Sequence, residues 1–144
     1  MVDLYQAAQD AQVVPEFELF DLGQVHALRR LIDTCGLPYG GKVHCDVVMG
    51  VPGAVPGSTV ALAAMVAAMP AEVTSWSATG IGRAHLPVMA AALSMDGHVR
   101  VGMEDTLTFA RGRAVAAPSR SLSAASAAVS FVCRVHPSPV RLKT

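Results

Sequence analysis

Four short apolar runs at nearly constant spacing limit the folds open to this chain more than any other feature. They begin 26, 30 and 25 residues apart, at residues 17–20, 43–49, 73–78 and 98–103, and a helical pattern clearly follows each of the first three. Strands that alternate with helices at a period below about 30 residues form parallel sheets joined by right-handed crossovers. The predicted fold class is therefore α/β.

Start and stop signals delimit the helices between these runs. Asp21 and Gln24 form a capping-box-like start, and Gly36 with Pro38 ends the helix that follows. Ser58 is expected to cap a helix over 59–69. A further helix has Pro87 in its first turn and ends near residue 96, and residues 3–13 are predicted as a helix before the first strand. The apolar face of the helix after Asp21 is expected to consist of Val25, Leu28, Leu31, Ile32 and Cys35.

Two architectures satisfy this order of elements. One is a small doubly wound parallel sheet, and the other is part of a (β/α)₈ barrel, which normally takes about 250 residues. The pattern alone does not choose between them, although four strands fit half a barrel. In both architectures the functional groups gather at the carboxyl ends of the strands.

The fourth run, HVRVGMED over residues 98–105, is the strongest candidate for chemistry. Side chains alternate along a strand, so Arg100, Gly102 and Glu104 are expected on one face, with Asp105 beginning the loop. An arginine beside a carboxylate keeps it ionised and orients it, which suits a metal ligand or a general base. The alternative interpretation is a structural ion pair at a strand end.

The sequence WSATGIGR, residues 76–83, is a second candidate. Gly80 and Gly82 are expected to present backbone N–H groups at a helix N-terminus, and Arg83 adds positive charge, which together favour an anion. A tight turn without a ligand is the alternative. His44 and Asp46 form an i, i+2 pair that could bind a metal, but a histidine satisfied by a neighbouring carboxylate is the commoner arrangement.

Charge and composition narrow the class of protein. The chain has zero formal net charge, yet residues 1–105 hold all the acids, while residues 106–144 hold six basic residues and no acid. The most apolar stretch is about half the length of a membrane span, and the N-terminus lacks a basic signal region. The three cysteines have no metal-binding spacing. These features predict a cytoplasmic α/β protein with reduced thiols, without membrane or nucleic-acid partners.

At this point the motifs resemble a known family. The runs ELFDLG, VHCDVVMGVPGAVPGS, SWSATGIGR and GHVRVGMEDTL are similar, in order and spacing, to the later part of the β-keto acid cleavage enzymes (3-keto-5-aminohexanoate cleavage enzyme-like proteins). The resemblance covers roughly residues 1–113. It implies that residues 1–112 are the C-terminal half of a TIM barrel. It also implies a zinc ion and acyl exchange between a β-keto acid and acetyl-CoA, which gives acetoacetate and a CoA thioester.

By match to the family motif, Glu104 resembles the carboxylate ligand of the metal, Asp105 the general base and Arg100 its orienting partner. The chain departs from the family in three places. It has no H-x-H pair to supply the other zinc ligands, Thr106 stands where the family usually has Asn, and residues 113–144 form an atypical basic tail, predicted to be disordered or translated out of frame.

These departures predict a fragment that is inactive alone. A small-anion-binding α/β domain and a non-catalytic remnant are the alternative interpretations. The intact family protein is expected to be a homo-oligomer.

Overall fold

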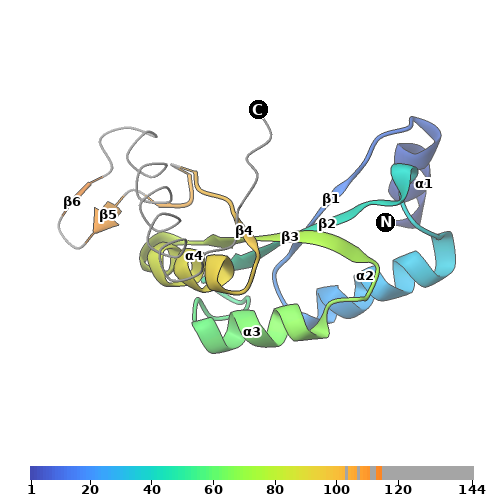
Figure 1. The fold of residues 1–144 in the computed structure, drawn as a ribbon. Helices are drawn as coiled ribbons and strands as arrows, with labels where there is room; N and C mark the ends of the chain where they lie inside the picture. The colour runs from blue at the N-terminus through green and yellow to red at the C-terminus, as the bar shows by residue number, and fades with distance from the viewer. Residues whose placement is uncertain (103, 107, 111–112, 115–144) are drawn as a thin grey trace, which may run out of the picture.

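A four-stranded parallel sheet forms the centre of the molecule (Figure 1). The structure, a computed structural model, describes residues 1–102, 104–106, 108–110 and 113–114. The strands lie in the order β1-β2-β3-β4, which is also their order along the chain. Their bounds are β1 Glu16–Leu19, β2 Val43–Met49, β3 Val73–Gly80 and β4 His98–Val99. The predicted α/β class is confirmed.

Helices α2 (Leu22–Cys35), α3 (Thr59–Ala68) and α4 (His85–Ser94) all lie against the same face of the sheet (Figure 1). Helix α1 (Val2–Asp10) precedes β1, and the short 3₁₀ turns η1 (Tyr39–Gly41) and η2 (Gly82–Ala84) precede β2 and α4. Strands β5 (Thr108–Ala110) and β6 (Arg113–Ala114) form a separate antiparallel pair, which the sequence pattern does not predict. None of the helices in the described part of the chain is long and apolar enough to cross a membrane.

The predicted caps form as expected. The Asp21 side chain accepts a hydrogen bond from the Gln24 N–H at 2.9 Å, and Gln24 Oε1 accepts one from the Phe20 N–H at 2.7 Å. Ser58 Oγ accepts from the Ala61 N–H at the start of α3. The bonds to Asp21 and Ser58 satisfy N–H groups that a helix start leaves without intrahelical partners, and the bond from Phe20 fixes the residue before the cap.

The strand registers divide the sheet into an apolar face and a polar face. Glu18 pairs with Asp46, Asp46 with Ser77 and Ser77 with His98, so these four side chains point to the same side. The opposite side buries the residues between them, and α2, α3 and α4 pack on it. This core includes Leu19, Val43, Cys45, Val47, Met49 and Ala78 from the strands, with Val25, Leu28, Leu62, Met65, Val88 and Ala92 from the helices.

Strand β4 is shorter than predicted. Only His98 and Val99 pair with β3, and one more bond joins the Arg100 N–H to the Ala78 carbonyl. The chain then turns, with the Asp105 N–H donating to the Gly102 carbonyl. The prediction that Arg100, Gly102 and Glu104 alternate along a strand is therefore wrong, because residues 102–105 form a turn. The space left by Gly102 is real, since the Glu104 side chain lies directly against it.

Three close contacts shape the carboxyl end of the sheet. A methyl group added to Gly80 would lie 2.6 Å from the Cα of His85, so this glycine allows α4 to begin directly against β3. Gly57 and Gly50, from the loop after β2, both pack on the Ala84 side chain. The loop over residues 50–57 is also joined to the residue that follows β1, because the Val55 N–H donates to the Phe20 carbonyl.

Strand β1 lies at one side of the four-stranded sheet, next to an apolar groove. The groove lies between α1, β1 and α2 and has a volume of about 390 Å³. Leu4, Tyr5, Phe17, Leu28 and Leu31 are among the residues that line it. Leu4 is largely exposed, so this face presents apolar surface to solvent.

Candidate functional site

Arg100 is at the centre of a cluster of carboxylates on the polar face of the sheet. Its Nη1 donates to Glu18 Oε1 at 2.8 Å and more weakly to Asp46 Oδ2 at 3.5 Å, and its Nη2 lies 3.7 Å from Glu104 Oε1. Glu18 belongs to β1, Asp46 to β2 and Glu104 to the turn after β4. Three separate parts of the chain thus meet at one guanidinium.

The guanidinium is in a strongly anionic environment. Burial lowers the pKa of Arg100, but the charges of Asp105, Asp46 and Glu18 outweigh this effect and raise the pKa above its ordinary value. Arg100 is therefore permanently positive, and it balances part of the negative charge that the carboxylates bring together.

Asp46 is the buried member of the cluster. Its side chain has no exposed surface, and it accepts hydrogen bonds from Ser77 Oγ at 2.6 Å and from Thr79 Oγ1 at 2.7 Å. An ionised carboxylate is an acceptor only, so two hydroxyl donors and a guanidinium suit the charged form. Both hydroxyls come from β3, the strand beside β2, so the carboxylate is fixed between the two central strands.

His44 extends this polar network toward the amino ends of the strands. Its Nε2 lies 3.3 Å from Ser77 Oγ, and its Nδ1 lies 2.8 Å from Ser75 Oγ. The Ser77 hydroxyl already donates to Asp46, so it accepts from His44, which requires a proton on Nε2. The expectation that a neighbouring carboxylate satisfies His44 directly is thus replaced by a serine bridge to Asp46.

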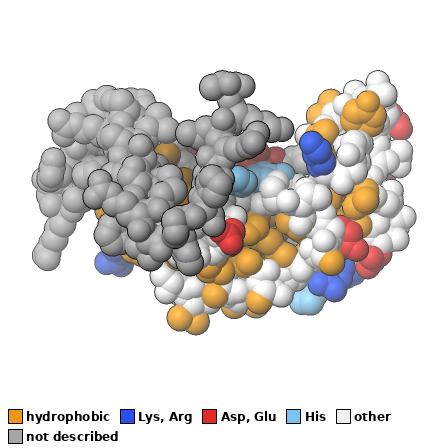
Figure 2. Space-filling model, viewed as in Figure 1, with side chains coloured by type: hydrophobic (Ala, Val, Ile, Leu, Met, Phe, Trp, Pro, Cys, Tyr) orange, Lys and Arg blue, Asp and Glu red, His pale blue; other side chains and the backbone are white. Residues whose placement is uncertain are grey.

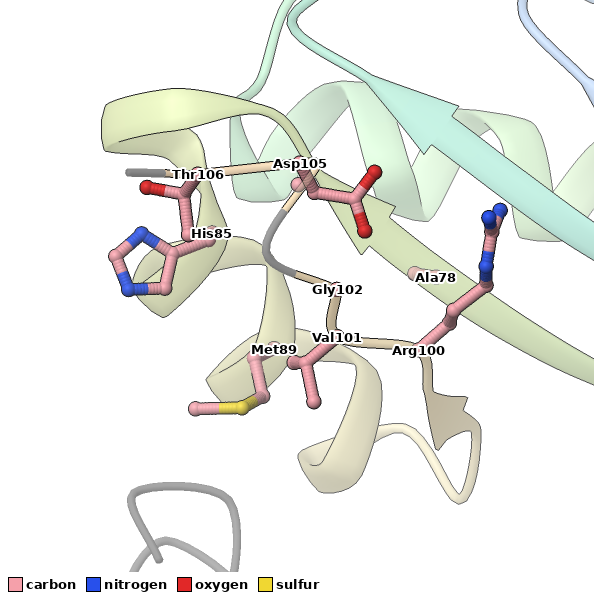
Figure 3. A pocket seen from close by; sticks show the side chains of 9 residues that line it. Ala78, His85, Met89, Arg100, Val101, Gly102, Asp105 and Thr106 are labelled. Carbon is pink, nitrogen blue, oxygen red and sulfur yellow. The ribbon is translucent and has the colours of Figure 1, made fainter. Parts of the chain in front are cut away.

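Asp105 borders a small pocket at the carboxyl end of β3 (Figure 3). Its Oδ2 is buried and, within the described residues, has no hydrogen-bond partner. Burial raises the pKa of the Asp105 carboxyl, and the nearby charge of Glu104 acts in the same direction, while Arg100 opposes both. A partly desolvated carboxyl with an unused oxygen has the character of a proton acceptor.

The pocket itself is narrow. Its cavity volume of about 10 Å³ is at the lower limit for one water molecule. Figure 3 shows Asp105 and Arg100 beside Ala78 of β3, with the polar ends of both side chains turned to the same side. His85, which the sequence analysis left without a role, also lines the pocket, and its Nδ1 donates to the Gly82 carbonyl at 2.7 Å.

The glycines of the predicted anion site have structural roles in this conformation. Gly80 allows the close approach of α4, and the Gly82 N–H donates to the Asp105 carbonyl at 2.7 Å. The Gly82 N–H is therefore engaged rather than presented to a ligand. Arg83 follows it with an exposed side chain.

The described residues do not form a metal site by themselves. They contain no group of three His, Cys, Asp or Glu side chains placed to share an ion. The Glu104 side chain is 68% exposed and forms an ion pair with Arg100. One exposed carboxylate does not fit zinc, which takes three protein ligands in catalytic sites.

Sequence reasoning identified Arg100, Glu104 and Asp105 but missed Glu18 and the role of Asp46. The structure brings Arg100 and Glu104 together and places Asp105 beside the same pocket. Glu18 and Asp46 are separated from Arg100 by 82 and 54 residues, so no local spacing joins them. The available signal was polar residues at alternate positions in otherwise apolar strands, which marks a polar sheet face.

Comparisons with known proteins identify the family of this chain. The family model for the beta-keto acid cleavage enzyme matches residues 1–134, and the chain belongs to this family. The match continues beyond Arg113, where the sequence analysis placed the end of the resemblance. The rest of the predicted tail lies outside the described residues, and its origin stays a prediction.

Three relatives illustrate the range of activities in the family. The chain is 37% identical over 101 residues to 3-dehydrocarnitine:acetyl-CoA trimethylamine transferase of Rhizobium meliloti, covering 70% of this chain and 33% of that protein. It is 34% identical over 100 residues to 3-keto-5-aminohexanoate cleavage enzyme of Fusobacterium nucleatum, covering 69% and 35%. It is 29% identical over 147 residues to 3-oxoadipate:acetyl-CoA acetyltransferase of Cupriavidus necator, covering 97% and 48%. The chain thus spans between about a third and a half of the length of these relatives.

Proposed function

We propose that this chain forms the carboxylate-bearing wall of a β-keto acid cleavage site, where acyl groups pass between a β-keto acid and acetyl-CoA. The observation that supports this most directly is the convergence of Glu18, Asp46 and Glu104 on Arg100, with Asp105 beside the same guanidinium. Relatives whose names pair 3-oxoadipate or 3-dehydrocarnitine with acetyl-CoA support the substrate classes.

The proposed architecture is half of a (β/α)₈ barrel rather than a doubly wound sheet. In a doubly wound fold helices cover both faces of the sheet, whereas a barrel has helices on the outside only. Here α2, α3 and α4 cover one face (Figure 1). The other face carries charged and hydroxyl side chains, among them Glu18, Asp46 and Ser77. Figure 2 shows histidine and acidic side chains together near the middle of the view, and many apolar side chains below them.

In the proposed reaction Asp105 is the general base. Its carboxylate would accept a proton from a substrate carbon made acidic by the adjacent keto group, and Arg100 would orient the carboxylate and balance its charge. Arg83 would contact acetyl-CoA, from the loop that Gly80 and Gly82 shape. The exposed Arg83 guanidinium suits the phosphate groups, because arginine recognises phosphate through several donors. These roles extend the family resemblance to this chain.

Glu104 is proposed as one ligand of a divalent metal, expected to be zinc, shared with another protein segment. The other ligands do not come from the described residues, since no three suitable side chains gather there. The isolated chain is therefore proposed to be a catalytically incomplete fragment. No step of the proposed chemistry is assigned to the metal.

A complementation assay tests this function. The purified chain would be assayed alone and mixed with the portion of the Cupriavidus necator relative that it does not match, in the presence of zinc. Substrates would be acetyl-CoA with 3-oxoadipate, 3-keto-5-aminohexanoate or 3-dehydrocarnitine. We expect formation of a new CoA thioester only in the mixture.

Matched variants make the assay specific. Turnover should be lost in Asp105→Asn and Glu104→Gln and retained in Glu16→Gln, an exposed carboxylate on β1 outside the cluster. A folded mixture with no turnover on any substrate would identify the chain as a non-catalytic remnant and would contradict the proposal.

A further inference from the structure

We propose that Asp46 is a positioning residue that holds the Arg100 guanidinium on the polar face of the sheet, beside Asp105. The catalytic part of this inference rests on the proposed function, but the contact itself does not. Asp46 and Arg100 are 54 positions apart in the sequence, so only the fold brings them together.

The three partners of Arg100 differ in how well they are fixed. Glu18 and Glu104 are 46% and 68% exposed, whereas Asp46 is 0% exposed. Moving the Asp46 carboxylate would break its hydrogen bonds from Ser77 and Thr79. Asp46 is therefore the rigid member of the cluster, even though the Glu18 contact is shorter.

Solvent screening also favours Asp46 as the residue that holds Arg100. Exposed ion pairs contribute about 0–1 kcal/mol and weaken with salt, because mobile ions and water screen them. A buried carboxylate is screened far less, and leaving it without a cation is costly. Among the described residues Arg100 is the cation that pairs with Asp46. At 3.5 Å this contact is long for a hydrogen bond, so charge attraction supplies most of it.

The position of Asp105 is set separately. Its carbonyl accepts from the Gly82 N–H, which attaches the turn after β4 to the loop after β3. Arg100 reaches the same side of β3 (Figure 3). If Asp46 fixes the guanidinium while Gly82 fixes the turn, the two groups keep their relative positions without depending on exposed carboxylates.

Nuclear magnetic resonance of the arginine side chains tests the contact directly. The full chain, labelled with ¹⁵N-arginine, would be studied in about 0.5 M NaCl, where exposed pairs are screened. The Arg100 Nε–Hε signal is identified by its loss in Arg100→Lys. We expect this signal to show restricted motion in the wild-type chain, in contrast to that of the exposed Arg30.

Four variants separate the possible causes. Asp46→Asn keeps the shape but removes the charge, and should give Arg100 the mobility of Arg30. Ser77→Ala removes one hydrogen bond on the other oxygen of Asp46, and Glu18→Gln removes the exposed pair; both should leave Arg100 restricted. Should Asp46→Asn fail to fold, Thr79→Val, which frees the oxygen facing Arg100, should give at least a twofold gain in mobility.

Three results would overturn the proposal. They are a mobile Arg100 in the wild-type chain, release of Arg100 by Glu18→Gln but not by Asp46→Asn, and equal release by Ser77→Ala and Asp46→Asn. The last would show that Asp46 only supports the sheet.

The complementation assay then separates the contact from the chemistry. We expect Asp46→Asn to lower kcat roughly 10- to 100-fold with little change in KM, as misplaced catalytic groups do. If Arg100 is restricted but the wild-type mixture shows no turnover, the proposed function is contradicted while the contact between Asp46 and Arg100 still stands. Full turnover of Asp46→Asn with a mobile Arg100 would overturn the positioning role alone.

Discussion

The Gly82 N–H donates a 2.7 Å hydrogen bond to the carbonyl of Asp105. This bond joins the loop between β3 and α4 to the turn after β4, so a residue predicted to bind an anion instead supports the proposed base. Gly82 has φ of +58°, a left-handed conformation that favours glycine. The nearest atoms leave room for a methyl group, so its backbone conformation is the main constraint on this position.

We therefore expect Gly82→Ala to lower the free energy of unfolding by about 1–2 kcal/mol, the usual penalty for a left-handed alanine. It should also speed hydrogen exchange at amide 82. Gly53→Ala is the matched control, because Gly53 also has positive φ and open space around it, whereas the bond to the Asp105 carbonyl comes from Gly82. Equal exchange at amide 82 in the two variants would contradict the role of this bond.

Asp105→Asn is expected to leave stability at pH 7 unchanged or higher. Burial raises the pKa of Asp105, so its contribution to stability is full below its unfolded pKa and is lost as pH rises through the folded pKa. The ionised carboxyl is thus unfavourable in the folded chain near neutrality, and the amide removes that charge.

Urea unfolding from pH 4 to pH 7 measures this effect. The stability of Asp105→Asn relative to the wild type should increase with pH, while Glu104→Gln, at an exposed site, should stay within about 0.5 kcal/mol. A loss above 2 kcal/mol at pH 7 for Asp105→Asn would indicate a structural rather than catalytic carboxylate.

Cys45 provides a test of the sheet core. Burial between β1 and β3 raises the pKa of its thiol from 9.0 to about 12. At pH 8 a disulfide reagent should therefore label Cys35, which is partly exposed, and not Cys45. A chain carrying Cys35→Ser and Cys133→Ser should react only as fast as it unfolds.

The same shift predicts a change with alkali. The contribution of the Cys45 thiol to the free energy of unfolding is complete below about pH 9 and is lost as pH rises from 9 toward 12. Removing the titrating thiol with Cys45→Ala, although it lowers overall stability, should flatten this part of the pH profile. Rapid labelling of Cys45 at pH 8 would show that the strands are not packed as described.

Trp76 reports on the turn before β4. Gly97 lies against the Trp76 ring, so a side chain at position 97 would displace the indole. Gly97→Ala should lower the free energy of unfolding by roughly 1–3 kcal/mol and shift the fluorescence of the single tryptophan. Ser94→Ala, which removes a hydroxyl bonded only to carbonyls of its own helix, should leave the emission unchanged.

The apolar groove beside β1 predicts self-association of the isolated chain. Exposed apolar surface next to an outer strand favours contact with another chain. Leu4→Lys should lower the association constant at least tenfold in sedimentation velocity. Val60→Lys, at an equally exposed site on α3, should have little effect. If both variants behave alike, the groove is not the contact surface.

Most of the fold was accessible from the sequence because its signals are local. The caps at Asp21 and Ser58 and the apolar spacing of α2 are set within one or two helical turns. The end of β4 was mispredicted because alternation from Arg100 to Glu104 imitates a strand. The turn there depends on Gly102 and on bonds to other segments.

The site was only half predictable. Glu104 and Asp105 follow from a compact motif, but Glu18 and Asp46 join Arg100 through the registers of β1, β2 and β3. A register depends on how the whole sheet assembles, so no local spacing contains it. The hydrogen bond from the Gly82 N–H to the Asp105 carbonyl could not be predicted for the same reason, because it joins two separate segments.

Ala84 fits between Gly50 and Gly57, with room for a methyl group and nothing larger. We therefore expect the loop over residues 50–57 and the start of α4 to shift together, while the bond from Val55 to Phe20 keeps this loop attached next to β1. A ligand that displaced either element would then displace both.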